Sequence, residues 1–161
     1  MCRIRVLGSV LACVMIGAFA LADPPKSDAA RKELEGLRGT WTCTGIERDG
    51  KEDRSEQARA GAGYMKLTFR GDTVRFEAVI LGEKVSQSGT IRIDPTTEPK
   101  RIDLTFNPGE EEAGPTIRGI YALAGDKLRI LWPKDEPERR PTTLRTKDGD
   151  GFEVHLFERS K

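Results

Sequence analysis

The sequence offers one thiol and one imidazole that could act together as a nucleophile and its base. Cys43 is the only cysteine after residue 22, and His155 is the only histidine in the chain. Cys43 follows Trp41 by two residues, so on a strand it shares the face of Trp41, where a lone thiol is usually a small apolar group. His155 lies between Val154 and Leu156, and it points outward if those two residues point inward. We therefore expect no Cys43–His155 catalytic dyad, because the thiol would lack an adjacent base.

The sequence also lacks the residue patterns of common metal-binding and phosphate-binding sites. Zinc sites need several Cys or His ligands, and the chain after residue 22 holds one of each. Asp148-Gly149-Asp150-Gly151 resembles the opening of a calcium loop, but no glutamate follows at the EF-hand spacing, so a Gly-rich turn is the better interpretation. Gly61-Ala62-Gly63 is not followed by the Gly-Lys-Ser or Gly-Lys-Thr of a phosphate loop. We therefore expect no cofactor, no bound metal and no enzymatic activity.

Charge and length narrow the class of protein. The chain has 27 Lys plus Arg and 26 Asp plus Glu, and this net charge of +1 is too small for a nucleic-acid binder. Its 161 residues suit one domain, and a domain of this size buries roughly two-thirds of its unfolded surface. Neither a metal nor a disulfide is needed to hold it together.

The first 22 residues have the layout of a secretory signal peptide. Arg3 and Arg5 precede an uncharged segment of 17 residues, 6–22, which ends in Ala20-Leu21-Ala22. We expect cleavage before Asp23, and therefore an exported protein, periplasmic or extracellular, with no membrane span left after cleavage.

Two alternatives to cleavage stay open. The 17-residue segment could be retained as an N-terminal membrane anchor, although a spanning helix needs about 20 apolar residues. Cys13 could instead be acylated as in a lipoprotein, although Leu11 is large for such a processing site and the cut would leave apolar residues 14–22 on the mature chain.

Hydrophobic periodicity predicts one short helix followed only by strands. Ala30, Leu34 and Leu37 recur at helical spacing after Ser27, a residue suited to cap a helix. From Gly39 onward, apolar and polar residues alternate in short runs that are separated by Gly, Asp, Asn and Pro. The eight predicted strands are 40–47, 64–70, 73–80, 85–93, 101–106, 116–123, 127–132 and 152–159.

The alternation gives the strands one dry face and one wet face, which is typical of an antiparallel meander with short connections. Eight such strands can close into an up-and-down barrel, and closure removes the exposed edges of an open sheet. A two-sheet sandwich is the alternative architecture. Segment 46–62, the longest polar stretch, is predicted to be a loop over one barrel end and a candidate lid.

Several motifs carry a family resemblance. Gly39-Thr40-Trp41, on the first predicted strand, resembles the G-x-W signature of lipocalins. The motifs that follow in order are Ile93-Asp94-Pro95-Thr96, Pro99-Lys100-x-Ile102-Asp103-Leu104, Gly119-Ile120-Tyr121-x-Leu123-x-Gly125-Asp126-x-Leu128 and Arg140-Pro141-Thr142. Together they resemble the planctomycete-type secreted lipocalin-like domain family. This resemblance implies an all-β, eight-stranded antiparallel lipocalin-like barrel at residues 37–161, exported from a bacterial cell and preceded by a lead and short helix at residues 23–36.

The resemblance supplies a structural role but no catalytic residue, because the family has no established activity. In lipocalins the Trp of the G-x-W signature closes the barrel floor and an Arg near the last strand covers it. The corresponding residues here are Trp41 and Arg159. Segment 133–141 is more charged than the family pattern leads us to expect, so the barrel rim could differ here.

The resemblance implies a cup-shaped barrel, and together with the apolar inner face and the signal-peptide layout it leads us to expect a secreted, non-enzymatic binding module that holds a small apolar or amphipathic ligand in the barrel. The residues expected to line the ligand site are Phe76, Leu104, Phe106, Ile117, Tyr121, Leu128 and Ile130. Side chains alone can also fill an eight-stranded barrel. The alternative is therefore a closed barrel that serves as a structural or protein-interaction domain of the cell envelope.

Overall fold

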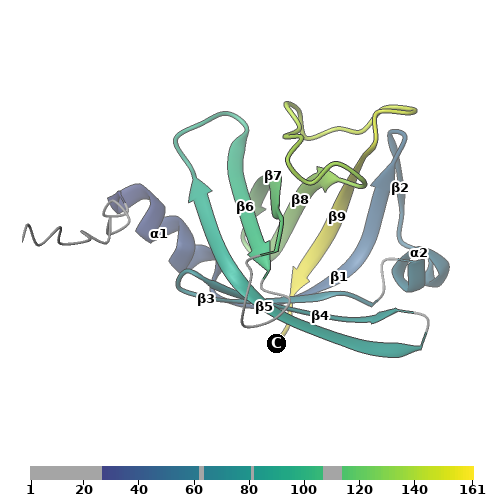
Figure 1. The fold of residues 1–161 in the computed structure, drawn as a ribbon, viewed down its shortest axis with the longest axis horizontal. Coiled ribbons are helices and arrows are strands. Elements are labelled where there is room, and N and C mark those ends of the chain that lie inside the picture. Colours follow the sequence, from purple (N-terminus) through teal and green to yellow (C-terminus); the bar gives the residue numbers. More distant parts are fainter. Residues whose placement is uncertain (1–26, 62–63, 81, 107–113) are drawn as a thin grey trace, which may run out of the picture.

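A computed structural model describes residues 27–61, 64–80, 82–106 and 114–161. These ranges hold two helices and nine strands (Figure 1). The predicted signal peptide at residues 1–22, including Cys13, lies outside them. Within them, neither helix combines the length and the apolar character needed to cross a membrane.

The predicted N-terminal helix is α1, Asp28–Leu37, and it buries Ala30, Leu34 and Leu37. Its start is fixed by Ser27, whose Oγ accepts a hydrogen bond from the Ala30 backbone N–H at 3.2 Å. Leu34 and Leu37 belong to the main hydrophobic core, so the apolar stripe of α1 packs onto the sheet. The prediction of one short helix before the strands is confirmed.

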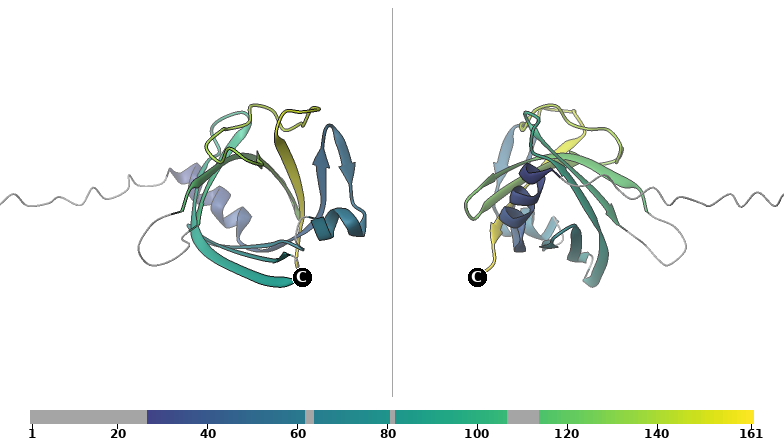
Figure 2. Two further views of the ribbon diagram at one scale, coloured as in Figure 1. Left: turned by 45° about the vertical axis from the view of Figure 1, so that its right-hand side comes forward. Right: turned by 90° about the vertical axis from the view of Figure 1, so that its left-hand side faces the viewer.

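All nine strands belong to one antiparallel sheet. They are β1 (Gly39–Arg48), β2 (Lys51–Asp53), β3 (Lys66–Arg70), β4 (Thr73–Ile80), β5 (Glu83–Asp94), β6 (Lys100–Phe106), β7 (Thr116–Ala124), β8 (Lys127–Pro133) and β9 (Phe152–Arg159). From β3 to β9 each strand pairs with the next, and β1 pairs with both β3 and β9. Eight strands therefore close a lipocalin-like barrel, and β2 is attached to β1 outside the ring (Figure 2). The predicted eight-stranded up-and-down barrel is confirmed, and the sandwich alternative is wrong because the ring of pairings is continuous.

Closure of the barrel runs along β1 and β9. Trp41 lies opposite Arg159, and the register shifts between Cys43 and Gly45, which marks a bulge in β1. The bulge needs a glycine, because a Cβ at Gly45 would lie 2.8 Å from the carbonyl oxygen of Asp53. The close approach allows β2 and the chain after it to fold back tightly against β1.

The segment 46–62 is not the loop over the barrel end that the sequence predicts. Asp49 and Gly50 have φ of 52° and 73°, a turn that reverses the chain from β1 into β2. The helix α2, Glu56–Gly61, follows and buries Ala58 in the main core. Hairpin and helix stand beside the barrel wall (Figure 2). The prediction of a lid-like loop with no second helix is wrong, because one small buried residue in a short, polar helix produces no apolar stripe.

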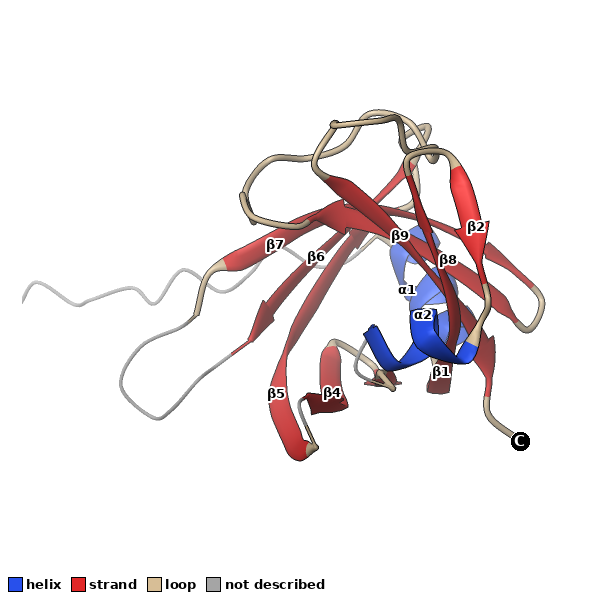
Figure 3. Cartoon of the chain, turned by 90° about the vertical axis from the view of Figure 1, so that its right-hand side faces the viewer, coloured by secondary structure: helices blue, strands red, loops and turns tan. Residues whose placement is uncertain are grey.

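The chain between β8 and β9, residues 134–151, forms an irregular strap on the outer face of the barrel (Figures 1 and 3). At its base the Lys134 N–H donates to the Gly151 carbonyl at 3.0 Å, and further along the Arg118 N–H donates to the Pro137 carbonyl at 2.7 Å. Leu144 of the strap packs on a second hydrophobic cluster, which lies outside the barrel core and consists of Ile120, Leu131, Val154 and Leu156. The charged segment 133–141 thus belongs to a covering layer on the barrel wall.

Arg140 ties the strap to the barrel, so its loss should loosen this layer. Its Nη1 donates to the Gly119 carbonyl at 2.7 Å and its Nη2 donates to the Asp103 carboxylate. We expect Arg140→Ala to lower the free energy of unfolding by about 1–3 kcal/mol, and to speed amide hydrogen exchange in the strap and β9. Urea unfolding and hydrogen exchange read by mass spectrometry measure both effects. Arg145→Ala, which alters an exposed strap residue, is the control; exchange at the wild-type rate in Arg140→Ala would contradict the tie.

Candidate functional site

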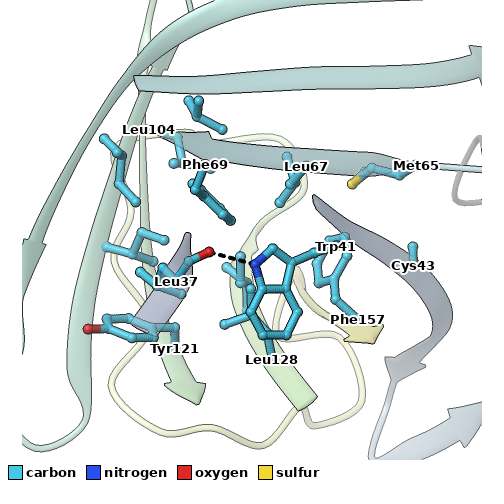
Figure 4. Packing of buried hydrophobic residues seen from close by; sticks show 14 of the residues in the cluster. Leu37, Trp41, Cys43, Met65, Leu67, Phe69, Leu104, Tyr121, Leu128 and Phe157 are labelled. Carbon is cyan, nitrogen blue, oxygen red and sulfur yellow. Dashed lines mark hydrogen bonds between the residues drawn. The ribbon is translucent and has the colours of Figure 1, made fainter. Parts of the chain in front are cut away.

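One end of the barrel is sealed around Trp41 (Figure 4). The Trp41 side chain is fully buried, and its Nε1–H donates to the Leu37 carbonyl at 2.7 Å. The Arg159 guanidinium carbon lies 4.2 Å from the centroid of the indole ring. Arg159 also donates through Nη2 to the Gly36 carbonyl at 2.8 Å and through Nε to the Asp126 carboxylate at 2.9 Å. The structure therefore brings together the two residues expected to form the plug, and Arg159 links them to the end of α1.

A second contact fixes α1 at the same end. Glu33 Oε1 accepts hydrogen bonds from Lys100 Nζ at 2.6 Å and from the Tyr121 hydroxyl at 3.2 Å. Burial, reinforced by the negative charge of Glu33, holds the pKa of Tyr121 well above its usual value. Tyr121 therefore stays a neutral donor whose hydroxyl points to the helix.

The sealed half of the barrel is filled by side chains. Four of the residues predicted to line a ligand site belong to this packed core and are at most 1% exposed: Leu104, Tyr121, Leu128 and Ile130. Figure 4 shows Leu128 next to Trp41, and Tyr121, Leu104 and Phe69 in the same packed cluster. This half is packed with buried side chains and contributes to stability.

The other half holds a cavity of about 470 Å³. Its walls are Met65, Leu67, Phe76, Gln87, Phe106, Ile117, Trp132, Pro133, Lys134, Asp135 and Glu153. Three of the predicted lining residues, Phe76, Phe106 and Ile117, are in this set and are only half-buried. The rings of Phe76 and Phe106 meet edge to face at 5.8 Å between centroids, which gives the cavity an aromatic wall.

His155 points into the barrel, so the expectation that it points outward is wrong. Its cross-strand neighbour on β8 is Ile130, which belongs to the barrel core, whereas Val154 and Leu156 belong to the outer cluster beneath the strap. Because the strap covers the outside of β9, both faces of this strand are buried. Alternation of apolar residues therefore could not identify its inner face.

The inner face of β8 and β9 is arranged in layers that descend from the cavity to the sealed end. Trp132 and Glu153 lie opposite each other and line the cavity. Ile130 and His155 form the next layer, and Leu128 and Phe157 the layer below it. The His155 and Trp132 rings are in tilted contact, with 4.8 Å between centroids and 49° between planes, so His155 lies one layer below the residues that line the cavity.

Glu153 is the ionised centre of a polar cluster on the cavity wall. Its carboxylate accepts hydrogen bonds from Arg48 Nε and from His155 Nε2, the latter at 3.3 Å, and Lys134 Nζ lies 3.6 Å away. Burial alone would raise the pKa of Glu153, but the hydrogen bonds from His155 and Arg48 outweigh it and lower the pKa to about 2. The cluster therefore places a fixed negative charge, paired with cations, beside an apolar cavity.

The other residues that the sequence offered as candidates for chemistry make contacts that suit a structural role. The Cys43 thiol is buried and donates to the Gly45 carbonyl at 3.4 Å, and burial raises its pKa. His155 contacts Glu153 instead of Cys43. Asp150 accepts hydrogen bonds from the backbone N–H groups of Lys147 and Phe152. These bonds are typical of a turn, as predicted for residues 148–151. Across the described ranges, no three His, Cys, Asp or Glu residues are grouped as a metal site would require.

Sequence reasoning missed the polar residues of the cavity wall, which are Gln87, Lys134, Asp135 and Glu153, and it missed His155 in the layer below them. The available signal was the register of β9. Placing Phe157 inside, with Leu128 and Ile130 inside on β8, also places Glu153 and His155 inside. The apolar neighbours Val154 and Leu156, if taken as inward-facing, favoured the opposite interpretation.

The chain matches no known family profile and no curated protein. Among solved structures, insecticyanin from the tobacco hornworm Manduca sexta is similar to it, with 16% identity and a TM-score of 0.46. The alignment covers 80% of this chain and 64% of insecticyanin, so the chain spans less than two-thirds of that protein's length. The lipocalin-like barrel of this chain is therefore established by its own strand pairing. Membership of the planctomycete-type secreted family stays a prediction.

Removing the plug arginine should destabilise the whole barrel. Arg159→Ala deletes the contact with Trp41 and the hydrogen bonds to Gly36 and Asp126, so we expect the free energy of unfolding to fall by about 1–3 kcal/mol. Urea unfolding measures the change. Arg38→Ala is the matched control, because the Arg38 side chain is 71% exposed. An Arg159→Ala protein as stable as the wild type would disprove the plug.

The lowered pKa of Glu153 predicts a specific acid sensitivity. Its stabilising contribution is complete above pH 4.5, the ordinary value for a glutamate, and is lost as the pH falls towards about 2. Glu153→Gln should therefore be less stable than the wild type at neutral pH, with a gap that narrows across this interval. Unfolding curves at a series of pH values test this. The control is Glu136→Gln, at an exposed position; a gap that stays constant with pH would uncouple Glu153 ionisation from folding.

Proposed function

We propose that this protein is a secreted, non-enzymatic binding module that holds a small apolar or amphipathic ligand at the open half of its barrel. The observation that carries the proposal is the cavity of about 470 Å³ that lies next to the fully packed part of the barrel core. Ligand pockets of small molecules commonly have volumes of about 300–1,000 Å³ and mostly apolar walls. Export rests on the signal-peptide layout of residues 1–22.

The division of the barrel into two halves supports a binding role. Packing around Trp41 and Leu128 supplies stability at one end, so the cavity side chains are not all needed to hold the fold. Phe76, Phe106 and Ile117 remain half-buried around the cavity and would be covered by an apolar guest. Burial of this surface is the driving force that we propose for binding.

The cavity wall favours an amphipathic guest over a purely apolar one. Gln87, Lys134, Asp135 and Glu153 are part of the same wall as the aromatic residues. A guest with one polar group can keep that group hydrogen-bonded while its apolar part lies between the rings.

Binding is tested with the neutral fluorescent probe N-phenyl-1-naphthylamine, whose emission rises in apolar surroundings. We expect the purified protein to enhance its emission in a saturable manner, and Ile117→Trp, which fills the cavity with an indole, to weaken this binding by at least about ten-fold, since each 1.4 kcal/mol of lost affinity is a factor of ten. Val79→Trp is the control, because Val79 is half-buried and is not part of the cavity wall. Equal binding by wild type and Ile117→Trp would place the probe elsewhere.

Trp132 reports where a guest sits. Bromine quenches indole fluorescence on contact, so 1-bromooctane in the cavity should quench Trp132 and leave the sealed Trp41 unaffected. The loss of emission should therefore disappear in Trp132→Phe. Absence of any probe uptake by the wild-type protein would refute the binding module and favour the closed-barrel interaction domain.

A further inference from the structure

The imidazole of His155 is an unusual group to find inside this barrel. Its side chain is 6% exposed and faces inward, one layer below the two residues Trp132 and Glu153 that line the cavity. Its ring is surrounded largely by apolar groups, with Trp132 at 4.8 Å, Phe157 at 6.3 Å between centroids and Ile130 as cross-strand neighbour. A polar ring in such surroundings needs a partner for each nitrogen.

One of the two ring nitrogens has a partner. Nε2 meets the Glu153 carboxylate at 3.3 Å. The lowered pKa of Glu153 keeps this carboxylate ionised, so it can only accept, and the proton of a neutral imidazole must lie on Nε2. Nδ1 is then a lone-pair acceptor.

The other nitrogen is an orphan. Nδ1 is buried and hydrogen-bonds to no group among the described residues. A buried acceptor left without a donor costs roughly 1–3 kcal/mol. His155 lies one layer below the cavity lining and contacts Trp132 of that lining, so a donor on a guest that reaches this layer would satisfy Nδ1.

We propose that His155 is a ligand-binding residue, whose Nδ1 accepts a hydrogen bond from a hydroxyl group of a small, mostly apolar guest. This inference rests on the proposed function and names its ligand class, an apolar alcohol or phenol. Glu153 is the positioning residue, because its hydrogen bond fixes the ring orientation and the tautomer.

The aromatic wall suits this class of guest. Phe76, Phe106 and Trp132 offer ring faces and edges for the apolar part, while the hydroxyl lies at the His155 layer. The same site discriminates against a guest that has only acceptors, because Nδ1 and the Glu153 carboxylate are acceptors too.

Three naphthalenes of similar shape test the inference by displacement of N-phenyl-1-naphthylamine: 2-naphthol, 2-methylnaphthalene and 2-methoxynaphthalene. We expect His155→Phe to weaken 2-naphthol by about three- to ten-fold, the value of one hydrogen bond, and to leave 2-methylnaphthalene within two-fold of wild type. His155→Gln is the second variant, because its amide can keep the donor to Glu153 while removing the acceptor at Nδ1. Gln87→Leu is the matched control at another polar position of the cavity wall.

The single histidine gives a readout that needs no variant. Nitrogen-15 spectra of the unmodified protein contain one imidazole, and they should report the tautomer with the proton on Nε2. We expect 2-naphthol to shift the Nδ1 resonance towards that of a hydrogen-bonded nitrogen, and the methyl and methoxy analogues to leave it in place.

The outcomes separate this inference from the proposed function. If no naphthalene displaces the probe because the probe itself does not bind, the binding module fails. If all three bind and Nδ1 responds equally to them, or if Gln87→Leu instead of His155→Phe removes the preference for 2-naphthol, the role of His155 is overturned.

Discussion

The structure depends on the closure of the sheet between β1 and β9. Without this pairing the eight strands would form an open, twisted sheet with two exposed edges. The stacking of Arg159 on Trp41 occurs at this seam, and the same guanidinium reaches the last turn of α1. One side chain thus joins the first strand, the last strand and the helix. The Arg159 contacts hold the side chains of the sealed end in place, and the open end has no such constraint from Arg159.

The two ends of the barrel obey different packing rules. At the sealed end, Trp41, Tyr121 and Phe157 interdigitate with leucines at almost zero exposure, as in an ordinary protein interior. At the other end, half-buried aromatic side chains border a cavity, and charged residues are part of the same wall. A charge is stable there because the Glu153 carboxylate pairs with Arg48 and Lys134 and has a hydrogen bond with His155. The cavity is therefore a region where apolar contact and hydrogen bonding are both available.

Much of the fold could be predicted from the sequence because the signals were local. All eight barrel strands and α1 follow from periodicity, and turn residues mark their limits. The second helix was not predicted, because Ala58 is its one buried residue among the described side chains and no apolar stripe results. The inner face of β9 escaped for a different reason: the strap buries Val154 and Leu156 on the outside, so a strand with two dry faces has no informative alternation.

The division of the predicted lining residues has a tertiary cause. Leu128 and Phe106 look alike in the sequence, as apolar residues on the inner face of a strand, yet one is fully packed and the other borders the cavity. The burial of each residue depends on the layer of the barrel in which it lies. That layer is set by the offset between neighbouring strands. Strand periodicity reports the face of a residue and contains no information on its depth.

The seam between β1 and β9 also imposes an order on folding. It joins Trp41 to Arg159, two residues almost as far apart as the barrel sequence allows, so the closing contacts have high sequence separation and form slowly. A ribosome must release nearly the entire barrel sequence before the ring can be completed. Until then the β1 edge of the nascent chain is unpaired and the Trp41 indole is exposed. Both features promote aggregation and are recognised by chaperones.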